Sequence, residues 1–319
     1  MSTNTPVTVR RRNGSGAPAG SGRPGRAGPR RRRTARVHLL MLAPAFLLVI
    51  GILVPFVQGV VKSFTNEKAY ITNPSFIGLD NYIALFSNER FRTGLLLTLL
   101  YVVVVLAVQL PLGLGIAVLL ERSTMIRRIG RNILVLPLLI PPIVAGLMWK
   151  TMMQPSAGVL NYLLAFAGVG DIPWLTDPST ALLSVVLIDT WAFTPFSALI
   201  MLAGLQSMPD YLREAATVDG ASRWQAFRYI SLPWLAPYIV LVALFRVADS
   251  LKQFDFIWPV TRGGPLNSTR LLHVQGYEEA FRFSSPAMAM AIIFVLWIIV
   301  YGVSFFLLRL WRRTVNAVE

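Results

Sequence analysis

Polar residues recur at helical spacing inside a part of the chain, 234–258, that is otherwise strongly apolar. They are Arg246, Asp249, Lys252 and Gln253, with Asp255 following one turn later. A charge at the centre of a membrane helix costs at least about 2.5–3.5 kcal/mol, so these residues should pair or face an aqueous cavity. An Arg246–Asp249 bridge would fix helix packing, whereas Asp249 to Asp255 would line a polar cavity. We expect Arg246 to be the more structural residue, and Lys252, Gln253 and Asp255 to belong to the cavity.

A second apolar segment carries one charge, Asp189, with Trp191 close to it, and both could face the same cavity. Other chemistry is excluded by composition. Cysteine is absent and there are two histidines, so Cys/His metal sites and thiol nucleophiles are not expected. No G-x-x-x-x-G-K-[ST] phosphate loop occurs, so we expect no ATPase site, no metal and no cofactor on this chain.

The elements that must position these residues are membrane helices. Of the 319 residues, 55% are hydrophobic and 14% are charged, which is typical of a polytopic membrane protein. Long windows with little charge predict an all-α fold of six transmembrane helices. The predicted spans are about 38–61, 93–120, 132–152, 181–205, 234–258 and 283–308. They form a six-helix transmembrane domain, 37–309, flanked by a disordered Arg-rich tail (1–36) and a C-terminal tail (310–319).

The distribution of charge predicts the orientation of these spans. Twenty of the 30 basic residues lie in the N-terminal tail, in the loops 121–131 and 206–232 and in the C-terminal end from Arg309, together with only five of the 15 acidic residues. Because basic loops stay inside, both termini and both loops are predicted to be cytoplasmic. The Arg-rich tail is explained by this topology and by anionic lipid, so nucleic acid is not an expected partner.

Local signals predict a short helix–turn–helix over 210–232, on the cytoplasmic side between spans 4 and 5. Pro209 and Asp210 suit a first turn, and Gly220 suits the end of a helix because it tolerates positive φ. Ser222 and Gln225 fit a capping box for a second helix. Pro233 would close that helix and start the next span. Periodicity alone leaves two interpretations open, an amphipathic connector at the lipid interface or a docking element for a cytosolic protein.

The stretch EAATVDGASRWQAFRYISLPWLAP at 214–237 resembles the signature of permease subunits of binding-protein-dependent ABC importers. It is similar to the subfamily that takes up sugars and related solutes, of the maltose and glycerol-phosphate type. FIGLDNY at 76–82, WAFTPF with AGLQSMP at 191–209, and TRGGPLNST at 261–269 are similar in the same order. The Arg-rich tail lies outside the family pattern.

The resemblance implies that the helix–turn–helix is a coupling element seated on a cytosolic ATPase, with Glu214 and Gly220 at its centre. The coupling residues that it implies are Glu214, Ala215, Ala216, Asp219, Gly220, Arg223, Trp224, Phe227 and Pro233. The partners that it implies are a second homologous permease, an ATPase dimer that binds ATP and Mg, and an extracytoplasmic solute-binding (lipo)protein.

The resemblance also implies transport of a sugar or polyol across a bacterial inner membrane by alternating access. The expected solute pathway consists of Asp249, Lys252, Gln253, Phe254, Asp255, Trp258, Asp189 and Trp191. Polar members would hydrogen-bond hydroxyl groups, and Phe254 and Trp258 would stack on pyranose faces. Four lysines against 26 arginines are typical of a GC-rich bacterium, in which a disaccharide such as trehalose is a plausible cargo.

Two other classes of function compete with this interpretation. An ion-coupled secondary carrier would use the intramembrane charges as its coupling site, but it has no use for the EAA element. A structural membrane scaffold would predict no transport defect when the chain is deleted.

Overall fold

A computed structural model describes residues 30–121 and 124–316 and divides into two units, Met1–Pro55 and Phe56–Glu319. The described part of the first unit is the N-terminal length of α1, which is basic as far as Arg36 and apolar beyond it. The helices are α1 Arg30–Lys62, α2 Asp80–Ser87, α3 Glu89–Glu121, α4 Thr124–Leu138, α5 Pro142–Met152, α6 Val159–Phe166, α7 Pro178–Gln206, α8 Asp210–Val218, α9 Arg223–Ala226, the π-helical turn η1 Phe227–Ser231, α10 Leu232–Leu251, α11 Ile257–Thr261, α12 Leu272–Phe281 and α13 Pro286–Asn316. The predicted all-α membrane fold is confirmed.

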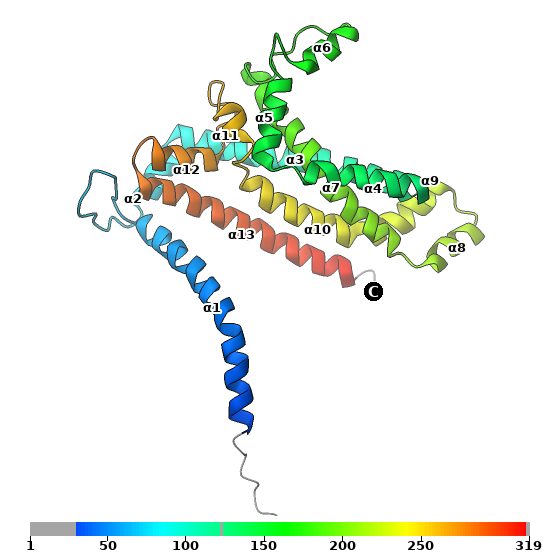
Figure 1. Cartoon of the computed structure of the whole chain (residues 1–319), viewed down its shortest axis with the longest axis horizontal. Helices are drawn as coiled ribbons and strands as arrows, with labels where there is room; N and C mark the ends of the chain where they lie inside the picture. The colour runs from blue at the N-terminus through cyan, green and yellow to red at the C-terminus, as the bar shows by residue number, and fades with distance from the viewer. Residues whose placement is uncertain (1–29, 122–123, 317–319) are drawn as a thin grey trace, which may run out of the picture. The chain divides into compact units, whose positions relative to one another are not determined.

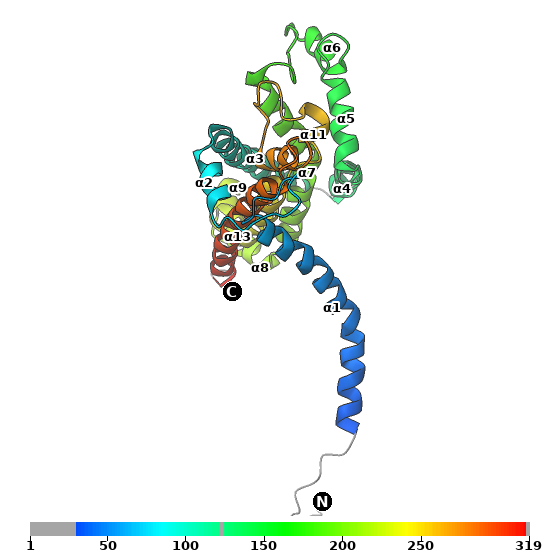
Figure 2. The same cartoon turned by 90° about the vertical axis from the view of Figure 1, so that its left-hand side faces the viewer.

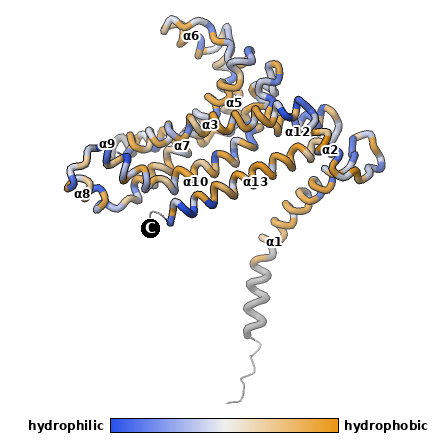
Figure 3. The backbone as a smooth tube through the Cα atoms, turned by 180° about the vertical axis from the view of Figure 1, so that it is seen from behind, coloured by the Kyte–Doolittle hydropathy of each residue, from blue (hydrophilic) through white to orange (hydrophobic). Residues whose placement is uncertain are grey.

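Five of the described helices are long and apolar enough to cross a membrane, or six if one bent pair counts as a single span. The five are Pro44–Lys62, Glu89–Glu121, Pro178–Gln206, Arg223–Leu251 and Pro286–Asn316. Figure 3 shows the long apolar stretches along α3, α10 and α13, with hydrophilic residues gathered toward the helix ends and connecting loops.

The core of the second unit lies where α3, α7, α10 and α13 pack side by side (Figure 1). Two glycines permit the closest approaches. A Cβ at Gly113 would lie 2.8 Å from the Cβ of Ser197, and one at Gly204 would lie 2.7 Å from the ring of Tyr238. The helices α3, α7 and α10 can therefore pack closely at these positions.

The connections gather at the two ends of the bundle. Figure 1 shows α8, α9 and the C-terminal end of α13 at one end, and α2 and α12 at the other. Figures 1 and 2 both show α5 and α6 extending away from the bundle. The segment 153–180 is held by Asn161, whose side chain accepts from the Trp174 indole at 2.8 Å and donates to the carbonyls of Pro155 and Ile172.

The predicted third span, 132–152, is not one continuous helix. The pair Ile129–Leu138 and Pro142–Met152 is bent by 94°. Pro141 and Pro142 cause the break, because proline removes a backbone donor and disfavours helical geometry in the residue before it. Pro141 is extended, with φ −55° and ψ 136°.

The predicted fifth span, 234–258, is also corrected. A continuous helical run begins at Arg223, because Leu232 N–H bonds to Phe227 O five residues earlier, and this π turn carries the chain past Pro233. The helix then ends at Leu251, where the sequence turns polar, so the residues 252–256 lie in a break before α11.

The tails differ from expectation where they are described. The helix α1 begins at Arg30, not after Arg36, and α13 continues through Arg313 to Asn316. The disorder predicted for 1–29, and the ends of both tails, lie outside the described residues.

Candidate functional site

A fully buried charge cluster links three helices at the centre of the bundle. Asp189 Oδ1 accepts from Arg246 Nη2 at 2.5 Å and from Gln109 Nε2 at 2.7 Å, while its Oδ2 accepts from the Tyr101 hydroxyl at 2.5 Å. Arg246 Nε donates to Gln109 Oε1 at 2.7 Å, and Nη2 reaches Ser250 Oγ at 3.2 Å. All five residues have no exposed surface. Both carboxylate oxygens of Asp189 are therefore occupied by protein donors.

Helical spacing explains why these side chains meet. Tyr101 and Gln109 are eight residues apart on α3, so they lie two turns apart on one face. Arg246 and Ser250 are four apart on α10, and Asp189 reaches them from α7. A polar stripe inside an apolar span was the available signal for Tyr101, Gln109 and Ser250, which the sequence analysis missed.

Arg246 and Asp189 are the charged members of the cluster, and their opposite charges compensate each other away from water. The Arg246 guanidinium also lies over the Phe193 ring, 4.3 Å from its centroid. Its Nη1 makes no hydrogen bond within the described chain and lies 3.9 Å from Asp249 Oδ2. The main partner of Arg246 is thus Asp189, and the expected Arg246–Asp249 bridge is only a long secondary contact.

The other predicted pathway residues occupy different surroundings. Lys252 and Asp255 are exposed, and Asp249 lies between Arg246 and Lys252, with Lys252 Nζ at 3.8 Å. Gln253 is buried, and its Nε2 has no hydrogen-bond partner in the described chain. The structure brings Gln253 and its neighbours to the non-helical break after α10.

The predicted aromatic residues fall into two groups. Phe254 and Trp258 stack at 5.7 Å, and both contact Tyr277 of α12. Trp191 instead packs edge-on against Trp149, at 5.6 Å. Tyr277 was missed because it is distant in sequence from the polar stripe. The roles of Phe254, Trp258, Trp191, Asp189 and the break residues in solute transport stay predictions.

The helix–turn–helix forms as its local signals predict. Gly220 adopts φ +68° after α8, and Ser222 makes both bonds of a capping box with Gln225. Residues 210–231 are called the hairpin below. The side chain of Arg213 joins the hairpin to the bundle, since it pairs with Glu121 at the end of α3 and donates to Leu205 O at 2.9 Å.

The surface of the hairpin is open. Of the expected coupling residues, Ala216 is buried and Phe227 is partly buried, whereas the others are exposed: Glu214, Ala215, Asp219, Gly220, Arg223, Trp224 and Pro233. Val218 is 87% exposed and Trp224 is 69% exposed. These two apolar side chains are therefore open to contact by a partner or by lipid.

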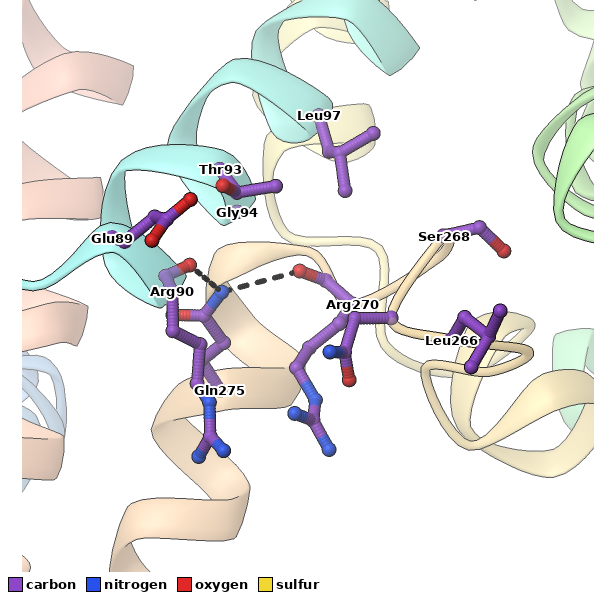
Figure 4. A pocket seen from close by; sticks show the side chains of 10 residues that line it. Glu89, Arg90, Thr93, Gly94, Leu97, Leu266, Ser268, Arg270 and Gln275 are labelled. Carbon is purple, nitrogen blue, oxygen red and sulfur yellow. Dashed lines mark hydrogen bonds between the residues drawn. The ribbon is translucent and has the colours of Figure 1, made fainter.

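A cavity of about 390 Å³ lies at the opposite end, between the start of α3 and the loop 262–270 (Figure 4). The Gln275 amide crosses it, donating to the carbonyls of Arg90 at 2.9 Å and Arg270 at 3.3 Å. The loop has a defined structure: Thr269 Oγ1 donates to Gly264 O at 2.8 Å, and Leu266 and Asn267 adopt positive φ.

The apolar spans, the sequestered charges and the exposed hairpin define an integral membrane protein of the permease class. Residues 109–314 match the family described as "Binding-protein-dependent transport system inner membrane component". The chain belongs to this family, and the resemblance inferred from the EAA stretch is confirmed.

Curated relatives in this family are permeases. The probable ABC transporter permease protein y4oQ of Sinorhizobium fredii is 37% identical over 86% of this chain and 90% of its own length. The trehalose/maltose transport system permease protein MalF of Thermococcus litoralis is 32% identical, covering 77% and 84%. The trehalose transport system permease protein SugA of Mycobacterium tuberculosis is 31% identical, covering 86% and 88%.

A solved structure shares the fold. A chain of a bacterial ABC transporter that imports the acidic polysaccharide alginate superposes with a TM-score of 0.78 at 23% identity, over 89% of this chain and 98% of that one.

Proposed function

We propose that this chain is a membrane-spanning permease subunit of an ATP-driven importer and moves a di- or oligosaccharide inward by alternating access. The exposed hairpin at one end of the bundle carries the proposal. It offers a surface to a partner, and it is connected to the bundle through the continuous run into α10 and through the Arg213–Glu121 pair. Relatives named for trehalose and maltose transport support a sugar as the solute, and trehalose is the first candidate to test.

The hairpin is proposed to dock on a cytosolic ATPase subunit, which holds the ATP and Mg. The run Arg223–Leu251 is continuous, so a displacement of the hairpin passes along one helix toward Arg246. Arg246 ties that helix to α7 and α3 through Asp189 and Gln109. Rigid-body motion of these three helices would open and close the solute pathway.

The opposite end is proposed to receive the solute from an external binding protein, with a second permease chain completing the pathway. The break after α10 would supply Lys252 and Asp255 for hydroxyl groups, and Phe254 and Trp258 for sugar faces. The cavity beside Gln275 lies at this end (Figure 4) and would be part of the docking face.

The proposed orientation places both termini and the hairpin in the cytoplasm. Because the chain has no cysteine, single cysteines at Thr217 and Leu266 report sidedness without background. We expect an impermeant thiol reagent added outside intact cells to label the L266C variant and to spare T217C. Labelling of T217C alone would reverse the orientation.

Coupling is tested by Gly220→Ala and Glu214→Gln in the assembled complex, with ATP hydrolysis and uptake of labelled trehalose and maltose measured in proteoliposomes. Left-handed backbone at a non-glycine residue costs about 1–2 kcal/mol, so the Gly220→Ala hairpin should lose its turn and its coupling. Gly168→Ala is the matched control, because Gly168 also has positive φ (+74°) and open space around its Cβ position. Solute-stimulated ATP hydrolysis that stays normal in both hairpin variants would contradict the coupling role.

A further inference from the structure

A groove of about 740 Å³ lies between the last turns of α3 and the hairpin. Its α3 wall is a stripe at helical spacing, made by Pro111, Leu114, Gly115 and Val118. Trp224 and Phe227, whose rings lie 5.8 Å apart, form part of the opposite wall. The groove is thus mainly apolar along the C-terminal turns of α3.

The rim of the groove is basic. Arg213 and Arg223 line it, and both also line a second hollow of about 210 Å³ between α8 and η1. Glu121 pairs with Arg213, whereas Arg223 makes no ion pair within the described part of the chain. One positive charge at the rim is therefore uncompensated.

The position of the groove matches the edge of a bilayer. The span α3 is apolar up to Glu121, and the groove lies along its last apolar turns. The apolar side of the groove therefore ends at charged residues, Glu121, Arg213 and Arg223. Trp224 lines the same groove and its side chain is 69% exposed, and tryptophan is enriched at membrane–water interfaces. Basic pockets beside transmembrane helices on the cytoplasmic side bind anionic headgroups.

We propose that this groove binds an anionic phospholipid of the inner leaflet, with the phosphate at Arg223 and an acyl chain along Leu114, Gly115 and Val118. The assignment to the inner leaflet rests on the proposed function, which places the hairpin in the cytoplasm. The charge on Arg223 selects an anionic lipid over a zwitterionic one. The bound lipid would brace the hairpin against α3 beside the Arg213–Glu121 pair.

Gly115 provides a direct test, because a Cβ built there meets nothing within 4 Å. Gly115→Phe fills the groove without displacing the described neighbours, and Gly115→Leu is a smaller second variant. Gly302→Phe is the matched control, since Gly302 also lies in a span with open space around it but does not line the groove. Arg223→Gln removes the charge, and Arg228→Gln removes an exposed charge of the hairpin outside the groove.

The experiment titrates the purified full-length chain with phosphatidylglycerol or phosphatidylcholine and counts retained lipids by native mass spectrometry. We expect an approximately fivefold preference for phosphatidylglycerol, the factor that one basic residue contributes near an anionic headgroup. Arg223→Gln should abolish that preference, Gly115→Phe should reduce retention of both lipids at least about tenfold, and both controls should stay within about twofold of the wild type.

Equal retention by Gly115→Phe, Gly115→Leu and the wild type would overturn the proposal, as would an equal loss in Gly302→Phe. Loss of a co-purifying permease or ATPase chain in Gly115→Phe, with lipid retention unchanged, would assign the groove to a protein interface and also overturn it. The assay needs neither transport nor ATP. Absence of lipid retention would therefore contradict the lipid proposal alone, and normal coupling in the Gly220→Ala and Glu214→Gln variants would contradict the proposed function alone.

Discussion

Removing one member of the Asp189–Arg246 pair should be far more destructive than removing both. Arg246→Met leaves the Asp189 carboxylate fully buried with only Tyr101 and Gln109 as donors. Loss of one partner of a buried ion pair costs about 3–5 kcal/mol, because the other charge stays desolvated and unpaired. We expect a loss of this size for Arg246→Met, and a similar loss for Asp189→Asn, which leaves the guanidinium uncompensated.

The double variant Asp189→Asn/Arg246→Met contains no buried charge, and its neutral amide can still bond to Tyr101 and Gln109. Its cost should stay below about 3 kcal/mol, since replacing both members of a buried pair is often nearly neutral. The coupling energy between the two sites should then exceed about 2 kcal/mol, within the range for groups in one network. The assay is unfolding of the full-length chain in mixed micelles by increasing denaturing detergent.

Lys252→Met is the control for loss of a charge on the same helix. Lys252 and Asp249 are both exposed and lie 3.8 Å apart, so this change should cost less than about 1 kcal/mol. Additive effects of the two cluster substitutions, with coupling below about 0.5 kcal/mol, would refute the reasoning that the pair acts as one buried unit.

Three further predictions concern separate sites. Gly204→Ala should cost about 1–3 kcal/mol in the same unfolding assay, because its Cβ would meet the Tyr238 ring at 2.7 Å, whereas Gly302→Ala has open space and should gain up to about 1 kcal/mol. Burial lowers the pKa of His273 to about 4, so the unfolded chain binds a proton at a higher pH than the folded chain does. The free energy of unfolding should therefore be full above pH 6.5 and fall as the pH drops toward 4, by about 3 kcal/mol more than in the His273→Phe variant. An equal dependence of this free energy on pH in both proteins would contradict the prediction. Asp255→Ala should weaken uptake without loss of complex assembly, and unchanged uptake kinetics would remove Asp255 from the proposed solute pathway.

Local features were predictable because their signals lie within a few residues of each other. Gly220 and the pair Ser222 and Gln225 form the turn and the cap that their residue types favour. The long apolar windows likewise predicted the helices that can cross a membrane, because span length follows from bilayer thickness. Two of the segments grouped by charge, the hairpin and the C-terminal end of α13, lie at one end of the bundle (Figure 1).

Helix boundaries were less predictable where proline and polar residues compete with apolar periodicity. Pro141 and Pro142 bend the third predicted span, and charge-free windows do not report a bend. Pro233 was expected to close a helix, because proline has no backbone N–H to donate. The π turn just before it keeps the chain helical, so the hairpin continues into α10.

The sequence by itself determined that this chain is a bundle of membrane helices with a hinged hairpin on one side, since hydropathy, charge and capping are properties of short segments. Only the tertiary structure decided the partner of Arg246. Helical spacing pointed to Asp249, three residues away, whereas the real partner is Asp189, 57 residues away, with Gln109 137 residues away. Spacing shows which face of a helix a charge occupies, but the packing of three helices decides which opposite charge can reach it without water.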